Sequence, residues 1–181
     1  MDRLDEYKII DDQAFGQLVN KYKERIYSVV LRIAGNKEDA KDLAQEAFVK
    51  AYANRHSFRA ESGFYTWVYR IAVNLTLNYV KRNRDRQAET IEETRMDMLA
   101  TDQTDNLEQT ELGQAITAAI DKLPARQKTV FILRHYEDKP HAEIAQLLSI
   151  TEGAVKANYH QAVQKLKSSL GLYLKDGRLV S

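Results

Sequence analysis

The sequence contains no cysteine and, in 181 residues, only two prolines and seven glycines. Without cysteine there is neither a disulfide framework nor a thiolate metal site. So few prolines and glycines leave few turns, which favours long regular elements. No run approaches the ~20 apolar residues of a membrane-spanning helix, and the charged start MDRLDEYK is unlike a secretory signal. These absences lead us to expect a cytoplasmic protein without membrane insertion.

Apolar residues recur with a period of about 3.6, and alternation with a period of two is absent, so the sequence predicts an all-α protein. The net charge of +1 is unevenly spread. Lys and Arg outnumber Asp and Glu by 15 to 11 in residues 1–84 and by 10 to 8 in residues 106–181, but are outnumbered by 7 to 2 in residues 85–105. We therefore expect two small helical domains, residues 1–84 and 106–181, that can face a polyanion and are joined by a flexible acidic linker, residues 85–105.

Residues 138–170 have the spacing of a helix-turn-helix. Thr151 would cap a long second helix by accepting its first backbone N–H groups. Small Ala145 would let the two helices cross closely, and Val155 would anchor the second one. Such a motif places the exposed N-terminal half of its second helix in the DNA major groove. The alternative is a plain helical hairpin inside a bundle, and Ser149 stands where many of these turns carry glycine.

The first block predicts a helix that Asp12 or Asp11 can cap and that runs through Ala34, ended by Gly35 in a left-handed conformation, and a second helix capped by Asn36. The second helix has the cleanest period, with apolar positions Ala40, Leu43, Ala44, Ala47, Phe48, Ala51 and Tyr52. The polar positions opposite are Asp42, Gln45, Glu46 and Lys50. Composition alone assigns this polar face to ordinary solvation.

The next helix, residues 64–84, carries four aromatic side chains within six residues. We expect its buried stripe to consist of Trp67, Ile71 and Leu75, with Val68 and Ala72. Tyr65 and Tyr69 would lie elsewhere, beside basic residues. Exposed rings next to cations are typical of single-strand binding, because rings stack on unpaired bases and cations hold phosphates. A helix that packs on both sides is the alternative.

The second block predicts a helix over residues 106–122, another that begins near Pro124, and a buried apolar run, VFIL, after Thr129. With the helix-turn-helix these make a four-helix domain. Within the linker, residues 90–98 could form a transient helix. The sequence assigns no role to the tail, residues 172–181.

Three segments, in this order, resemble bacterial sigma factors: LAQEAFVKAY at residues 43–52, SFRAESGFYTWVYRIAVN at residues 57–74, and the terminal helix-turn-helix. The resemblance is to the small extracytoplasmic-function (ECF) group of the sigma-70 family, which keeps only regions 2 and 4. It implies a region 2-like domain in residues 1–84 and a region 4-like domain in residues 106–181. It also implies a protein without chemistry of its own that joins core RNA polymerase, directs it to promoters and helps melt the DNA.

The resemblance further implies three partners. They are core RNA polymerase, through its beta-prime and beta subunits, promoter DNA, and an anti-sigma factor that can hold the protein at the membrane. Linkers of the family thread past the polymerase active site, where acidic charge mimics nucleic acid; a plain solvated tether is the alternative for residues 85–105. We expect no cofactor, no metal and no small-molecule substrate.

Position by position, the resemblance assigns residues to three surfaces. The residues that would dock on a coiled coil of the largest polymerase subunit are Asp42, Gln45, Glu46 and Phe48. The resemblance thus replaces ordinary solvation as the explanation of this polar face. The minus-ten element, with a flipped base held by the loop 57–63, falls to Ser57, Phe58, Arg59, Glu61, Ser62, Asn74, Asn78, Lys81 and Arg82. The minus-thirty-five element falls to Glu152, Lys156, Ala157, Asn158, His160 and Gln161.

Many members of the family carry arginine where this chain has Asn158 and Gln161. Arginine reads guanine with two hydrogen bonds, whereas asparagine and glutamine suit adenine edges. The sequence therefore predicts an altered or weaker minus-thirty-five preference.

Two other classes of protein compete with this interpretation. A two-domain DNA-binding regulator that is not a polymerase subunit would show the same helix-turn-helix, but its first block should carry a βα pattern or a cofactor motif, and neither is visible. An enzyme is disfavoured because the four histidines, at 56, 135, 141 and 160, are scattered and no Gly-rich phosphate loop or nucleophile motif appears.

Overall fold

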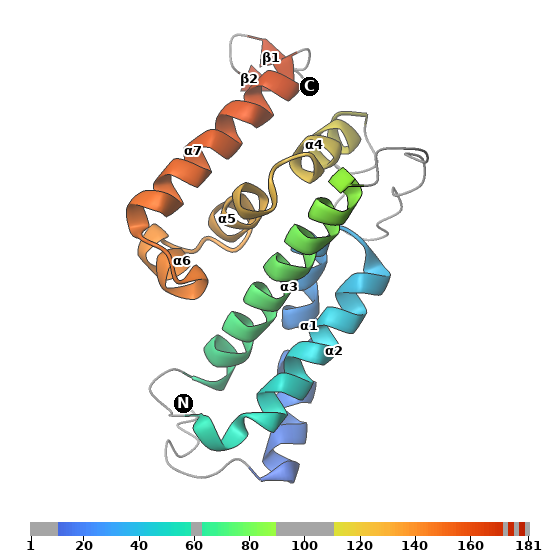
Figure 1. The fold of residues 1–181 in the computed structure, drawn as a ribbon, viewed down its shortest axis with the longest axis vertical. Helices are drawn as coiled ribbons and strands as arrows, with labels where there is room; N and C mark the ends of the chain where they lie inside the picture. The colour runs from blue at the N-terminus through green and yellow to red at the C-terminus, as the bar shows by residue number, and fades with distance from the viewer. Residues whose placement is uncertain (1–10, 59–62, 90–110, 172–173, 176–177, 180–181) are drawn as a thin grey trace. The chain divides into compact units, whose positions relative to one another are not determined.

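The computed structural model describes residues 11–58, 63–89, 111–171, 174–175 and 178–179. The chain divides into two compact units, unit 1 within residues 1–79 and unit 2 within residues 80–181. Unit 1 holds α1 (Asp12–Ala34), α2 (Lys37–Ala53), the 3-10 turn η1 (Arg55–Ser57) and most of α3 (Phe64–Glu89) (Figure 1). Unit 2 holds α4 (Glu111–Asp121), α5 (Ala125–His135), α6 (His141–Leu148), α7 (Glu152–Ser169) and the strands β1 (Leu174–Lys175) and β2 (Arg178–Leu179).

The all-α class is confirmed, with one small exception in the tail. The two-residue strands β1 and β2 form an antiparallel pair in which Leu174 faces Leu179. This pair could not be predicted from alternation of polar and apolar residues, because two residues per strand are too few to show it.

The connection between α1 and α2 follows the predicted chemistry. Asp11 caps α1, its Oδ1 accepting from the N–H of Ala14 at 2.7 Å. Gly35 ends α1 at φ 89°, a left-handed conformation that costs glycine little. Asn36 caps α2, its Oδ1 accepting from the N–H of Asp39 at 2.8 Å. The predicted stop and cap are both confirmed, and two residues suffice to turn the chain back.

The predicted core face of α2 is confirmed with one departure. Ala40, Leu43, Ala44, Ala47, Phe48 and Ala51 are all buried. Tyr52 is instead exposed, because its hydroxyl reaches out to donate to Asp12 Oδ1 at 2.8 Å. That hydrogen bond raises the pKa of Tyr52 above its ordinary value. The tyrosine therefore ties the end of α2 to the start of α1.

The predicted buried stripe of α3 is wrong for most of its members. Val68 and Ala72 are buried as expected, but Trp67, Ile71 and Leu75 are only half-buried. The core positions are Phe64, Val68, Tyr69, Ala72, Val73, Thr76 and Leu77. The error arises because α3 carries apolar side chains on nearly every face, so periodicity alone could not select the side that packs on α1 and α2.

The position of Tyr69 is the clearest of these corrections. We expected it away from the core, yet only 1% of it is exposed. Its ring lies 5.5 Å from that of Tyr65, centroid to centroid. Tyr65 is half-buried between Tyr22 and the guanidinium of Arg25, 4.3 Å above its ring. These tyrosines belong to helix packing, which was the alternative explanation of the aromatic cluster.

Helix α3 also runs further than predicted, to Glu89 instead of residue 84. The first five residues assigned to the linker are therefore helical. The remaining linker positions, including the predicted transient helix at 90–98, lie outside the described residues. The same holds for residues 106–110 at the start of the fourth predicted helix, which is described from Glu111.

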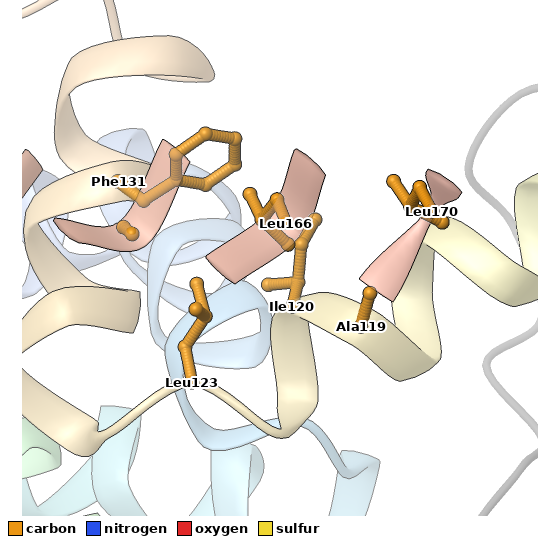
Figure 2. Packing of buried hydrophobic residues seen from close by; sticks show 7 residues of the cluster. Ala119, Ile120, Leu123, Phe131, Leu166 and Leu170 are labelled. Atoms are coloured by element: carbon orange, nitrogen blue, oxygen red, sulfur yellow. The ribbon is translucent and has the colours of Figure 1, made fainter. Parts of the chain in front are cut away.

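The core of unit 2 joins α4, α5 and α7. Figure 2 shows its side chains meeting between these helices: Ala119, Ile120, Leu123, Phe131, Ala162, Leu166 and Leu170. The apolar run from Val130 to Leu133 is buried throughout, as predicted. Pro124 stands just before α5 and serves as its N-cap residue, in keeping with its missing N–H.

The helix-turn-helix is built as the sequence predicts. Ile144, Ala145, Leu147 and Leu148 of α6 are buried, and Val155 of α7 is fully buried. Thr151 caps α7, its hydroxyl accepting from the N–H of Ala154 at 3.1 Å. Ser149 ends α6 in the left-handed conformation, at φ 52° and ψ 47°. This is the position where glycine would be unstrained.

Candidate polymerase-binding and DNA-binding surfaces

The polar face of α2 forms the first candidate surface. Asp42, Gln45 and Glu46 are exposed on it, and spacings of three and four put them on one side of the helix. Lys50 pairs with Glu46 across one turn, with 3.0 Å between Nζ and Oε1. The face is therefore an exposed acidic and amide surface on a rigid helix whose other side is fixed in the core.

Phe48 does not belong to this face, which corrects the sequence-based assignment. It is only 8% exposed and lies on the core side of α2. Val49 takes its place, since it is 59% exposed and lies three residues after Glu46. The signal for Val49 was present in the sequence, because it continues the spacing of Asp42, Gln45 and Glu46. We call Asp42, Gln45, Glu46 and Val49 the α2 face.

The second candidate surface surrounds the loop between η1 and α3. Ser57 is exposed, and its hydroxyl donates to the carbonyl of Asn54 at 2.7 Å. Phe58 is half-buried, with its ring 5.1 Å from Trp67 and 6.2 Å from Phe64. Arg59, Glu61 and Ser62 lie outside the described residues. The aromatic side chains therefore fix the point at which the loop leaves η1.

Helix α3 continues this surface. Asn74, Asn78, Lys81 and Arg82 recur at steps of three and four, so they share one side of the helix. A groove of about 340 Å³ lies beside the first two and is lined by Lys50, Arg70, Ile71, Asn74, Leu75 and Asn78. The side-chain amide of Asn74 donates to the carbonyl of Arg70 at 2.9 Å. Amides and cations, but no carboxylate, line this groove, which suits a polyanion.

The third candidate surface is the outer side of α7. Glu152, Lys156, Ala157, His160 and Gln161 are exposed there, and Asn158 is half-buried. Lys156 Nζ lies 2.8 Å from Glu152 Oε1. The hydrogen bond from Lys156, then its charge, lowers the pKa of Glu152. Since the folded pKa is the lower one, the stability from this pair is present above the usual glutamate range and is lost as the pH falls through the lowered value.

Two amides on α7 have one end already engaged. Asn158 Nδ2 donates to the carbonyl of Ala154 at 2.8 Å, within the helix. Gln161 Oε1 accepts from Gln127 Nε2 of α5 at 2.7 Å. Sequence reasoning missed Gln127, because periodicity places it in a buried helix and gives no hint that its amide reaches a neighbouring helix.

The described residues contain no group of three or more His, Cys, Asp or Glu side chains that could hold a metal ion. Within the same residues, no helix combines the length and apolar character needed to cross a membrane.

Comparison with known proteins decides the family. The model of sigma-70 region 2 matches residues 18–86, and that of sigma-70 region 4 matches residues 113–166. The chain is 34% identical over 177 residues to the ECF RNA polymerase sigma factor SigW of Bacillus subtilis, covering 93% of this chain and 95% of the relative. The chain belongs to the ECF sigma factors of the sigma-70 family. This ECF sigma factor is also 34% identical over 176 residues to the RNA polymerase sigma-H factor of Pseudomonas aeruginosa, covering 92% of this chain and 91% of that one.

Solved structures show the same fold at lower identity. The sigma factor RpoE of Bartonella quintana, in complex with the anti-sigma factor NepR, aligns with a TM-score of 0.69 at 21% identity, over 88% of this chain and 98% of that one. CnrH, in complex with the cytosolic domain of CnrY, aligns with a TM-score of 0.61 at 21% identity, over 90% of each chain. The predicted family and fold class are confirmed. The protein is an alternative sigma factor of RNA polymerase, and its family comprises regulatory DNA-binding proteins rather than catalysts.

Proposed function

We propose that this ECF sigma factor binds core RNA polymerase through the α2 face and carries promoter specificity on its two other surfaces. The observation that carries the proposal is the α2 face itself. It places a strongly exposed valine among two carboxylates and an amide, on a helix anchored by six buried residues. An exposed apolar side chain inside a polar patch is typical of a protein interface, where it is covered by the partner.

The minus-ten element is read, in this proposal, by the region around the loop 57–63 and by α3. A base flipped out of the stack loses stacking energy, so its receptor must return contacts. Phe58 and Trp67 supply an aromatic wall next to the loop, and Ser57 lies at its start. Arg59, Glu61 and Ser62 remain proposed contacts on the loop itself. Asn74, Asn78, Lys81 and Arg82 would meet the adjoining DNA and help hold it open.

The minus-thirty-five element is read by α7 from the major groove. Lys156 would hold the phosphate backbone, with Glu152, Ala157, His160 and Gln161 also exposed on α7 and Asn158 half-buried. With amides in place of arginine at two of these positions, we infer a preference that differs from the common one of the family. An unbiased promoter selection that returned the common family motif would contradict this part.

The proposed organisation is a region 2-like domain in residues 1–84, a flexible acidic linker in residues 85–105 and a region 4-like domain in residues 106–181. The proposed partners are core polymerase, promoter DNA and an anti-sigma factor, in the cytoplasm or at the membrane through that anti-sigma factor. The complex of RpoE with the anti-sigma factor NepR, a protein of the same fold, supports the last of these. We propose no catalysis, cofactor, metal or small-molecule substrate.

The first experiment tests polymerase binding. The Asp42→Arg/Glu46→Arg variant reverses both carboxylates of the α2 face. We expect wild type to bind purified bacterial core RNA polymerase, and the variant to bind roughly 30-fold or more weakly, because like charges now meet and at least ~2 kcal/mol is lost. Fluorescence anisotropy or surface plasmon resonance gives both dissociation constants.

A matched control is Glu24→Arg/Glu111→Arg, which changes the net charge equally at exposed positions outside both the α2 face and the linker. It should bind like wild type. Absence of binding by folded wild-type protein, free of any inhibitor, would instead favour a stand-alone DNA-binding regulator. Equal binding by all three proteins would move the docking surface away from α2.

A further inference from the structure

We propose that Gln127 of α5 is a positioning residue that fixes which bases α7 can read, by turning the side chain of Gln161 so that its NH₂ group faces outward. The proposal rests on the proposed reading of the minus-thirty-five element by α7. It assigns a DNA-specificity role to a residue outside the helix-turn-helix, in the core of unit 2.

The first observation is where Gln127 lies. It is only 8% exposed on a helix whose next positions, Thr129 to Leu133, are all buried. The two buried polar residues that follow it have partners on α4 and on α5 itself. Lys128 pairs with Asp121, and Thr129 donates to the carbonyl of Ala125 at 2.9 Å. Gln127 differs from both, because it reaches to α7.

The second observation is the direction of the contact. Gln127 Nε2 donates to Gln161 Oε1 at 2.7 Å. The carbonyl oxygen of Gln161 therefore points toward α5, so its second lone pair also lies on that side, and the NH₂ group, at about 120° to the oxygen on the same carbon, is the end that can face outward. Gln161 is exposed on α7, one turn after Ala157. What it presents to a ligand is thus a donor rather than an acceptor.

The third observation is an unsatisfied atom. Among the described residues, nothing forms a hydrogen bond with Gln127 Oε1, which is buried. A buried acceptor without a donor is unfavourable, and an apolar side chain of the same size would avoid the penalty. An amide at this position therefore does not serve the packing of unit 2. The NH₂ group of Gln127 forms the hydrogen bond to Gln161, and we infer that the amide is kept for this contact. Residues that are unfavourable for packing are often found at functional sites.

The consequence is a specific base preference. Glutamine reads adenine with both ends of its amide, accepting from N6 and donating to N7. With its carbonyl turned to Gln127, Gln161 is left to donate, and guanine offers two major-groove acceptors, O6 and N7. We therefore expect guanine over adenine at the base pair that Gln161 meets. This changes the expectation from residue type alone, which favoured adenine.

The test uses holoenzyme made from the full chain and bacterial core RNA polymerase, transcribing a promoter library randomised at the minus-thirty-five element. Sequencing the transcripts gives the base preference at each position. Gln161→Ala should abolish the preference at one position and so locate it. Gln127→Met keeps the length of the side chain but removes its amide, which frees the Gln161 carbonyl. At the located position we expect the ratio of guanine to adenine to fall by roughly tenfold.

A second variant reverses the hydrogen bond. In Gln127→Glu the carboxylate can only accept, so Gln161 must donate to it and turn its carbonyl outward. The preference should then move to bases with major-groove donors, adenine or cytosine. Adding Gln127→Met to Gln161→Ala should change nothing further at the located position. Gln114→Leu, an amide lost from the exposed side of α4, is the matched control and should behave like wild type.

The outcomes separate the two proposals. If wild-type holoenzyme selects no minus-thirty-five sequence, or forms no holoenzyme, the proposed function fails. If it selects one, and Gln127→Met is folded by circular dichroism but keeps the wild-type preference at the located position, Gln127 only packs and this inference fails. A preference of wild type for adenine at that position would also overturn it. Should Gln127→Glu not fold, the Gln127→Met result decides alone.

Discussion

Ser149 has a left-handed backbone conformation that its side chain does not favour. It ends α6 at φ 52° with the ordinary Cβ of an L-residue, and its N–H closes the helix by bonding to Gln146. The left-handed conformation is unfavourable for any residue with a Cβ, by about 1–2 kcal/mol. The turn of the helix-turn-helix therefore forms in spite of this residue, through the burial of its neighbours Leu148 and Val155.

Ser149→Gly should stabilise unit 2. The gain from relieved strain exceeds the extra freedom of glycine in the unfolded chain, so we expect about 0.5–1 kcal/mol in the free energy of unfolding. Urea denaturation followed by far-ultraviolet circular dichroism measures it. Ser168→Gly makes the same change inside α7, where glycine is unfavourable, and should not stabilise. Equal effects at both sites would show that strain at residue 149 is not the cause.

At this scale, local chemistry was predictable from sequence and tertiary hydrogen bonding was not. Gly35, Asn36 and Thr151 act within three or four residues of themselves, so their roles as stop and caps could be deduced. Gln127 and Gln161 are 34 positions apart, and the residues next to either of them in the sequence do not indicate their hydrogen bond. Phe48 was assigned to docking by resemblance although its apolar position already predicted burial, and Val49, which continues the spacing of the polar face, was overlooked.

The α4–α5 corner is the element-scale feature with the sharpest consequence. Lys128 is 4% exposed on α5, and its Nζ lies 2.8 Å from Oδ1 of Asp121 at the end of α4. A buried ammonium is tolerated only while it is paired, and removing its partner is more harmful than removing the charge itself. We therefore expect this ion pair to hold α4 and α5 at a fixed angle and to contribute little net free energy of folding.

We expect Asp121→Ala to lower the free energy of unfolding of unit 2 by roughly 2–3 kcal/mol, less than for a fully buried pair because Asp121 is half-exposed. Lys128→Met should cost under about 1 kcal/mol, since the methionine fills the same space without charge. Combining the two should be milder than Asp121→Ala alone. Urea midpoints test this, and Lys122→Met, at an exposed neighbour, is the control. An additive double variant would mean that the two residues do not interact.

Helix α3 shows why elements can be predicted when their orientation cannot. Its existence followed from a long run without glycine or proline, but its apolar residues leave no clearly polar side between residues 64 and 80. Tyr69 and Val73 are buried, whereas Trp67 and Ile71 are only half-buried, because the packing of α1 and α2 determines which side of α3 faces the core. By contrast, the apolar positions of α2 recur every three or four residues opposite a polar face, and its buried face was predicted correctly apart from Tyr52.

At the scale of the whole molecule, the fluorescence of the single tryptophan reports the unfolding of one unit alone. Trp67 lies in unit 1, whereas circular dichroism reports the helices of both. We expect two transitions that do not coincide, because each unit has its own core. Asp121→Ala should lower the circular dichroism midpoint of one component and leave the midpoint of Trp67 fluorescence unchanged. A shared shift in both signals would show that the units unfold together.

The short link at Gly35 and Asn36 also bears on how the chain acquires its structure. Since α1 and α2 are neighbours in sequence and pack on each other, their contacts close loops that are short beside Gly35 and reach 40 residues between Asp12 and Tyr52. Low contact order favours fast folding, and chains fold from the N-terminus as they leave the ribosome. The hairpin that carries the α2 face is thus the first element able to form during synthesis. Under the proposed function, the surface that binds polymerase can therefore form before the ribosome has made α7, the helix proposed to read the promoter.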